Sequence, residues 1–164
     1  MTRERRADLV FEHGSRFVAR TGTGRSVVFG DHPGENELSP VETIVTALAA
    51  CSAMDVVAIA TKKRQAIDRY EVHALAEQRD DYPQVLTEVT VTHEVWGTNL
   101  EEAAIRRSIE LSATKYCPVN AMISAGATVV HHLYVLHVTG PTPREASGEV
   151  TSTGPYRRPD VVPE

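Results

Sequence analysis

The sequence is poor in cysteine and in aromatic residues. Only 2 of its 164 residues are cysteines, and 5% are aromatic. Two cysteines cannot form the framework of a small disulfide-rich secreted domain, and they show neither a CxxC pair nor the spacing of a four-ligand zinc site. We therefore expect no metal and no cofactor.

The chain also lacks a basic excess and long apolar runs. Its formal charge is −5, which argues against a nucleic-acid partner. No apolar stretch approaches the roughly 18 residues of a membrane span, and no signal-peptide core follows the charged N-terminus. The expectation is a cytoplasmic protein without a membrane partner.

Composition divides the chain into a domain over residues 1–138 and a tail over 139–164. Five of the nine prolines fall after Gly140, in a stretch with almost no apolar periodicity. Such a segment buries too little surface to offset its ordering entropy. We expect this tail to be flexible or draped on a partner.

Apolar periodicity and turn residues predict an α+β fold with mainly antiparallel strands. Short apolar segments separated by turn residues predict a three-strand meander over 9–29. The remaining predicted elements are a helix from Ser39 to about Ala66, strands over 70–78 and 86–96, a helix over 100–116 capped by Asn99, a short helix ending near Gly126, and a strand over 127–138. The order is β-β-β-α-β-β-α-α-β.

The long helix has a strong start signal. Ser39-Pro40-Val41-Glu42 combines a capping serine, a proline at the first helical position and an acid three residues after the cap. Alanine is frequent in the helix, which favours helix and keeps its surface narrow. We expect other elements to pack closely around it.

The two cysteines lie in different predicted surroundings. Cys51 lies mid-helix with Asp55 among apolar residues on its side, whereas Pro118 places Cys117 at a helix break, where N–H groups favour a thiolate. These rules make Cys117 the easier thiolate and Cys51 the more sheltered one. Free cysteines are also often small buried hydrophobes, so both could be inert.

The segments around the cysteines resemble one known family. Ala-Leu-Ala-Ala-Cys51-Ser-Ala-Met-Asp on a long helix, followed by Lys115-Tyr116-Cys117-Pro118-Val119-Asn120 at a helix break, is similar to the OsmC/Ohr family of osmotically inducible and organic hydroperoxide resistance proteins. The resemblance covers residues 9–138 and looks nearest to the less characterised OsmC-like branch.

This resemblance implies a fold, an assembly and a chemistry. The family fold is an intertwined α+β homodimer whose sheets enclose two long central helices. In peroxidase members, the cysteine matching Cys51 attacks an organic hydroperoxide, and the one matching Cys117 resolves the sulfenic acid as a disulfide. A dithiol reductant then restores both thiols. The implied function is a thiol peroxidase in oxidative-stress defence.

One position departs from the peroxidase pattern. Peroxidase members place a glutamate after the proline, where it holds an arginine, and this chain has Val41 there. The neighbouring Glu42 is a candidate substitute, although it also suits a capping box. Arg25, after a glycine turn, is the candidate for the cation.

Two alternatives therefore stay open. Arg16 and Arg20 lie in the same meander as Arg25, so any of the three could approach Cys51. The protein could also be a non-enzymatic OsmC-like carrier or redox-responsive binding protein that keeps both thiols.

His131 and His132 face opposite sides of a strand, and an ordinary surface or dimer-contact role is expected for them.

Overall fold

The computed structural model describes residues 3–31 and 36–154. It contains two compact units, Met1–Ile44 and Val45–Glu164, each of which is described by itself. The predicted single domain over 1–138 stays a prediction. The α+β fold class is confirmed, because the described residues form three α-helices and two sheets of three and four strands.

The N-terminal unit contains the predicted meander. Strands β1 (Ala7–His13), β2 (Arg16–Thr21) and β3 (Ser26–Phe29) form an antiparallel sheet in that order. Gly24 in the second turn has a φ of 80°, a conformation that glycine adopts without steric cost. Turn residues between short apolar runs were therefore a sufficient signal for this sheet.

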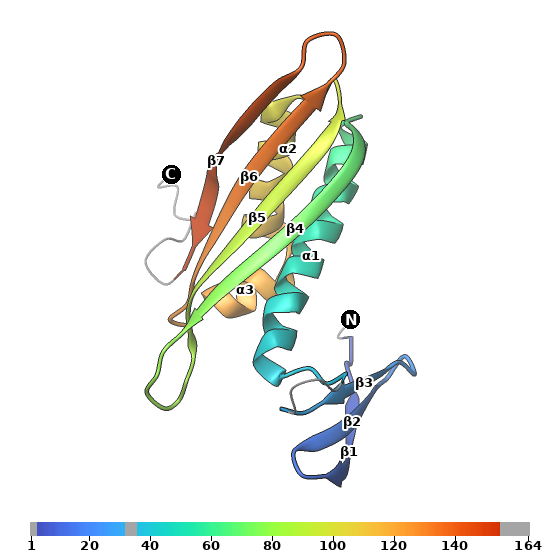
Figure 1. Ribbon diagram of the computed structural model, residues 1–164, viewed down its shortest axis with the longest axis vertical. Helices are drawn as coiled ribbons and strands as arrows, with labels where there is room; N and C mark the ends of the chain where they lie inside the picture. Colours follow the sequence, from blue (N-terminus) through green and yellow to red (C-terminus); the bar gives the residue numbers. More distant parts are fainter. Residues whose placement is uncertain (1–2, 32–35, 155–164) are drawn as a thin grey trace. The chain divides into compact units, whose positions relative to one another are not determined.

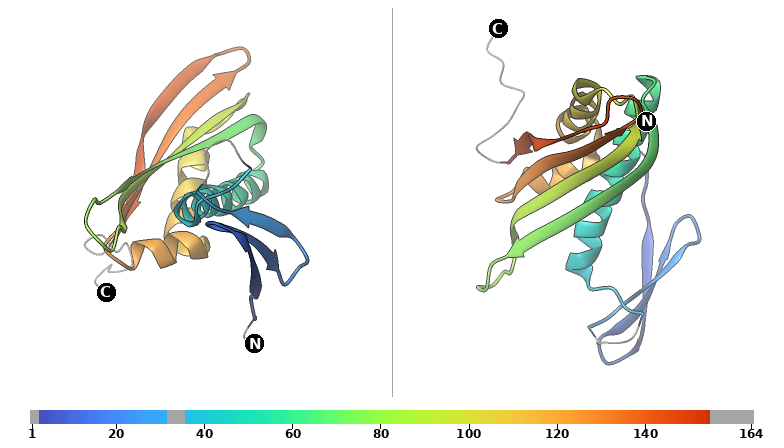
Figure 2. Two further views of the ribbon diagram at one scale, coloured as in Figure 1. Left: turned by 60° about the horizontal axis from the view of Figure 1, so that its bottom comes forward. Right: turned by 45° about the horizontal axis from the view of Figure 1, so that its top comes forward.

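The second unit is built on a four-stranded sheet covered by helices. The strands are β4 (Ala66–Gln78), β5 (Leu86–Thr98), β6 (Val129–Thr139) and β7 (Arg144–Thr153), in that order across the sheet. The β5–β6 pair is parallel and the other two pairs are antiparallel. In this unit the helices lie along one face of the sheet (Figures 1 and 2).

Strand β7 corrects the prediction of a flexible tail. Arg144–Thr153 pairs with β6 along its length, although this stretch contains little apolar periodicity. As an edge strand, β7 needs only one hydrogen-bonded neighbour, and its polar side chains suit an exposed edge. The tail's last ten positions, 155–164, lie outside the described residues.

Helix α1 (Pro40–Lys62) starts where the sequence predicts and ends earlier than expected. Its start is a complete capping box: the Ser39 Oγ accepts from the Glu42 N–H at 3.1 Å, and Glu42 accepts from the Ser39 N–H at 3.0 Å. At the other end, Arg64 adopts a φ of 57°, which stops the helix before Ala66.

By length and composition, α1 could cross a membrane, which corrects our expectation that no segment approaches that size. Core helices of soluble proteins can have the same length and composition.

The second long helix is shorter than predicted and ends in a π-helical turn. Helix α2 covers Glu102–Leu111, the π-turn η1 covers Ser112–Tyr116, and helix α3 covers Pro118–Ser124. Asn99 is not the cap as predicted, because it has a φ of 57° and Glu101 occupies the N-cap position. Cys117 is the N-cap of α3, as the sequence predicts.

The π-turn has an identifiable cause in its hydrogen bonds. The Cys117 N–H donates to the Ser112 carbonyl, five residues back, at 2.9 Å. The Ala113 carbonyl, which an α-helix would offer to that N–H, accepts instead from the Asn120 side-chain amide at 2.8 Å. The asparagine side chain thus competes for a backbone acceptor and widens the turn.

The core of the second unit consists of two apolar clusters. One is centred on Val56, Ile105 and Leu136 from α1, α2 and β6, and the other contains Leu48, Val91 and Cys117 with Cys51 packed against it. His93 and His132 lie on the buried faces of β5 and β6 and are fully buried. A polar layer therefore runs through the core.

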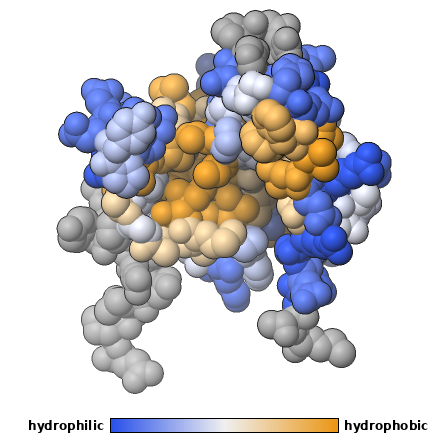
Figure 3. All heavy atoms as spheres, turned by 90° about the horizontal axis from the view of Figure 1, so that it is seen from below, coloured by the Kyte–Doolittle hydropathy of each residue, from blue (hydrophilic) through white to orange (hydrophobic). Residues whose placement is uncertain are grey.

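Several large apolar side chains stay exposed in the single chain. On α1 these are Ile44, Met54 and Val57, with Met54 74% exposed. On β1 they are Leu9, Val10 and Phe11. Figure 3 shows hydrophobic side chains gathered on the surface seen from below. Exposed apolar surface of this kind is typical of an interaction face.

The capping box gives a first testable prediction. Ser39→Ala removes the acceptor for the Glu42 N–H and should lower the free energy of unfolding by about 1 kcal/mol. Chemical denaturation at fixed protein concentration measures the change. Glu42→Gln is the control, because glutamine keeps an acceptor for the Ser39 N–H. Equal stability of Ser39→Ala and the wild type would show that this cap contributes nothing.

Candidate active site

The structure brings Cys51 of α1 together with Cys117, the N-cap of α3. Their sulfur atoms and a carboxylate oxygen of Asp55 all lie within 4.8 Å of one another. Cys51 is partly exposed, whereas Cys117 is only 3% exposed. Both cysteines are free thiols in this structure. The site thus contains two neighbouring thiols of unequal accessibility and one carboxylate.

Burial changes the expected reactivity of Cys117. Removal from water raises the pKa of the Cys117 thiol, and its hydrogen bond with Cys51 adds to the effect. The Asn120 N–H donates to its sulfur at 3.3 Å and acts in the opposite direction, but more weakly. Burial thus opposes the predicted ease of forming a thiolate at Cys117, because desolvation outweighs the helix N-terminus.

Asp55 is held beside the thiols by a hydroxyl from the π-turn. It follows Cys51 by one helical turn, so both side chains lie on the same side of α1. The Ser112 Oγ donates to Asp55 Oδ2 at 3.1 Å and lies 3.3 Å from the Ser52 Oγ. The carboxylate is thereby fixed toward the sulfur atoms.

A buried chain of hydrogen bonds links Asn120 to β4. The His132 Nε2 lies 3.1 Å from Asn120 Oδ1, the His132 Nδ1 lies 3.3 Å from the His93 Nε2, and the His93 Nδ1 lies 2.6 Å from the Tyr70 hydroxyl. The Asn120 amide donates to the Ala113 carbonyl, so Asn120 Oδ1 must accept. When both histidines are neutral, each therefore carries its proton on Nε2, and Tyr70 donates to His93.

With the proton of each histidine on Nε2 alone, both histidines are neutral, and their burial favours this form. Burial lowers the pKa of His93 to about 3, and His132 contributes to the shift. Burial also lowers the pKa of His132 to about 4, with a smaller effect of His131. The expected surface or dimer-contact role is wrong for His132, whereas His131 is partly exposed and pairs with Glu149 at 3.0 Å.

The candidate cations all lie in the N-terminal unit. Arg25 is exposed in the turn between β2 and β3. Arg16 pairs with Glu12 at 2.8 Å and with Glu37 at 2.6 Å, and Arg20 is exposed on β2. An approach of any of them to Cys51 stays a prediction.

Glu42 has a structural task that the sequence also suggested. Its carboxylate accepts from the Ser39 N–H in the capping box. A catalytic role that holds an arginine stays a prediction. Val41, at the position of the glutamate in peroxidase members, offers no hydrogen-bonding side chain.

Sequence reasoning missed most of the polar side chains around the thiols. His93 follows Val89 and Val91 at alternate positions of one strand, which is the signal of a buried histidine. Asn120 stands three residues after Cys117, where its backbone N–H reaches the capping sulfur. Both positions could have been found from these local patterns.

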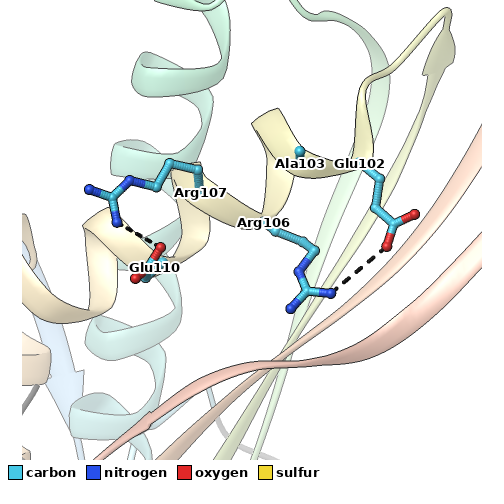
Figure 4. A pocket seen from close by; sticks show the side chains of 5 residues that line it. All are labelled: Glu102, Ala103, Arg106, Arg107 and Glu110. Carbon is cyan, nitrogen blue, oxygen red and sulfur yellow. Dashed lines mark hydrogen bonds and ion pairs between the residues drawn. The ribbon is translucent and has the colours of Figure 1, made fainter.

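A surface groove on α2 is separate from the thiols. Its lining includes Glu102, Arg106, Arg107 and Glu110 (Figure 4). Glu102 and Arg106 contact Tyr134 of β6. Arg107 pairs with Glu110 at 2.7 Å, and Arg106 lies 3.9 Å from Glu102. The charges in this groove are mutually paired, so they indicate no ligand.

Comparison with known proteins agrees with the fold. A family model described as OsmC-like protein matches residues 32–132. The chain belongs to the OsmC-like family. This OsmC-like chain is also 32% identical to Protein YhfA of Escherichia coli over 123 residues, which cover 75% of this chain and 92% of YhfA.

Solved structures share the fold of this OsmC-like protein at lower identity. A hypothetical protein from Aquifex aeolicus aligns with a TM-score of 0.75 at 23% identity and covers 85% of this chain and 100% of that one. An organic hydroperoxide resistance protein OsmC from Legionella pneumophila aligns with a TM-score of 0.59 at 13% identity and covers 85% and 99%.

Because His93 and His132 are buried in the neutral form, we predict that this OsmC-like protein loses stability at acidic pH. Because their pKa values are lowered from about 6.5 in the unfolded chain, the unfolded state binds more protons below that pH, and stability is lost as the pH falls. Between pH 7 and pH 5 the free energy of unfolding should drop by about 2 kcal/mol for each buried histidine. Chemical denaturation across this range measures the drop.

Two variants test the assignment of this loss to the core. His93→Gln, which can still donate and accept, should remove about half of it. His137→Gln is the control, because the pKa of the partly exposed His137 is raised by hydrogen bonds with Glu94 and Glu145, so this residue opposes the loss. A His93→Gln protein with an unchanged pH dependence would contradict a neutral buried pair.

Proposed function

We propose that this protein is a dithiol peroxidase that reduces organic hydroperoxides in the cytoplasm. The observation that carries the proposal is the pair of sulfur atoms of Cys51 and Cys117 within 4.8 Å. Membership of the OsmC-like family and structural similarity to an organic hydroperoxide resistance protein support it. Its role is defence against peroxide stress.

The unequal surroundings of the thiols support a division of roles. Cys51 is partly exposed and can meet a substrate. Cys117 is buried, and its raised pKa keeps it protonated, so it is poorly suited to attack first. We assign attack on the peroxide to Cys51 and resolution to Cys117.

The proposed reaction balances in two steps. The Cys51 thiolate attacks one oxygen of ROOH, the O–O bond breaks, and the alkoxide takes a proton to leave as ROH. The Cys117 sulfur, deprotonated in the process, then attacks the Cys51 sulfenic acid, forms the disulfide and releases water. A dithiol donor reduces the disulfide and restores both thiols.

One alternative is favoured by a specific observation. The group within 4.8 Å of both sulfurs is the carboxylate of Asp55 rather than a cation, and Val41 stands where peroxidase members have a glutamate. A redox-responsive or small-ligand-binding protein with two slow thiols would have these properties. Such a protein would react once with peroxide without rapid turnover.

We further propose that the protein works as a homodimer. The exposed Met54 and Val57 on α1 support this, since a 23-residue apolar helix with an uncovered face is unfavourable in water. In the resemblance to OsmC/Ohr proteins, the corresponding helices lie at the centre of the dimer. The proposed partner surface is therefore the exposed face of α1.

The cysteine roles predict different outcomes for two variants. Cys117→Ser should still consume one equivalent of cumene hydroperoxide and accumulate a sulfenic acid at Cys51, whereas Cys51→Ser should be inactive. Stopped-flow peroxide consumption with a dihydrolipoyl donor, together with mass spectrometry, measures both. Hydrogen peroxide serves as the competing substrate.

The same assay separates the two proposals. Steady turnover by the wild type supports the peroxidase, and a single stoichiometric oxidation supports the redox-responsive alternative. A Cys51→Ser protein that reduces peroxide as fast as the wild type would overturn the assignment of attack to Cys51.

The dimer proposal is tested through the exposed face of α1. Met54→Glu and Val57→Glu introduce charges into an apolar contact and should raise the fraction of monomer measured by sedimentation. Ala103→Glu, at an exposed position of α2 outside the proposed surface, is the control. A wild-type protein that sediments as a monomer at micromolar concentration would refute the dimer.

A further inference from the structure

The thiol pair and its carboxylate also form a set of potential metal ligands. Cys51, Asp55 and Cys117 each direct one ligand atom into a space where all three atoms lie within 4.8 Å of one another. Two come from adjacent turns of α1, and the third comes from the N-cap of α3. Ligands from two elements of one packed unit are held in place before a metal arrives.

The distances are close to those of an occupied site. Zinc bonds of about 2.3 Å to sulfur and about 2.1 Å to oxygen put tetrahedral ligand atoms about 3.5 to 3.8 Å apart. Ligand atoms within 4.8 Å need to move inward by only about 1 Å. Side-chain rotation supplies a movement of that size.

Hydrogen bonds behind the ligands orient two of the three. The Ser112 Oγ donates to Asp55 Oδ2 at 3.1 Å, which leaves the other carboxylate oxygen for a metal. The Asn120 N–H donates to the Cys117 sulfur at 3.3 Å, and the Asn120 side chain is fixed by His132. Partners of this kind orient ligands in known metal sites and raise affinity.

We infer that the reduced protein binds one thiophilic divalent cation, of the class of Zn²⁺, through Cys51, Asp55 and Cys117. Two thiolates and one carboxylate select such a cation over Mg²⁺ or Ca²⁺, which prefer oxygen ligands. Binding displaces one proton from each thiol to the solvent, and the bound site carries a charge of −1. Three protein ligands leave the fourth tetrahedral position open to water or to an external thiol.

This inference differs from the expectation of no metal and is independent of the peroxidase proposal. A metal-bound pair cannot close a disulfide, so the cation would hold the thiols reduced and block attack on peroxide. A second cluster, Glu71, His73 and Glu94, has the right atoms but is a weaker candidate. His73 is exposed, and Arg69 already pairs with Glu71.

Cobalt titration of the reduced protein tests the site without any peroxide. Co²⁺ takes the place of Zn²⁺ and produces near-ultraviolet charge-transfer bands only when thiolates bind it. We expect these bands to saturate at one Co²⁺ per chain, to disappear on addition of Zn²⁺, and to be accompanied by release of two protons in weakly buffered solution. Saturation at one equivalent without charge-transfer bands would overturn the inference.

Matched variants assign the ligands. Asp55→Asn removes the anion at nearly constant size and should weaken Co²⁺ binding at least tenfold, and Ser112→Ala should weaken it about tenfold. Cys51→Ser and Cys117→Ser should each lose part of the charge-transfer intensity. His73→Gln, in the surface cluster, should leave binding unchanged. Equal affinity of Asp55→Asn and the wild type, with both proteins folded by circular dichroism, would refute a site that includes Asp55.

Discussion

The structure depends on one requirement: the polar layer inside the core must keep every hydrogen bond satisfied. Among the described residues, no buried side-chain nitrogen or oxygen lacks a partner. The direction of these hydrogen bonds is set at Asn120, whose side-chain amide donates to the Ala113 carbonyl, so that its oxygen accepts from His132. With both histidines neutral, His132 then accepts from His93, and His93 accepts from the Tyr70 hydroxyl. A single unpaired group in this layer would cost about 1 to 3 kcal/mol.

Hydrogen bonds connect the thiol site with this polar layer and hold its residues in position. Asn120 connects the histidines with the backbone that carries Cys117, and Ser112 connects the layer with Asp55. Ser52 lies between them, 3.5 Å from the His93 Nε2. The positions of both the buried thiol and the carboxylate are therefore coupled to the same core that gives the fold its stability. Chemistry and folding cannot be altered independently here.

Local patterns were enough to predict most of the helices and strands and the position of Cys117 at a helix N-terminus. The Ser39 cap, the alternation in β5 and the proline after Cys117 each act within a few residues, so the sequence shows them directly. The π-turn and β7 were not predictable in this way. The first depends on a side chain that reaches back seven residues, and the second on pairing with β6 across a turn.

The electrostatic order of the thiols also required the structure. The helix-terminus rule considers the backbone around Cys117, but the depth of burial is a property of the packed unit. The same holds for Asp55, whose spacing from Cys51 was visible while its approach to Cys117 was not. The sequence identifies candidate residues, but contacts between distant segments determine their burial and their neighbours.

The π-turn determines the direction in which the side chains that follow it point. Because the Cys117 N–H bonds to Ser112 rather than to Ala113, the turn before α3 contains one more residue than an α-helical turn. Each residue of an α-helix advances the side-chain direction by about 100°. A chain without the extra residue would present a neighbouring side chain to α1, with the second thiol rotated away from the first. The proximity of the two sulfur atoms therefore depends on the extra residue in the π-turn. That residue is accommodated because the side-chain amide of Asn120, outside the turn, binds the Ala113 carbonyl.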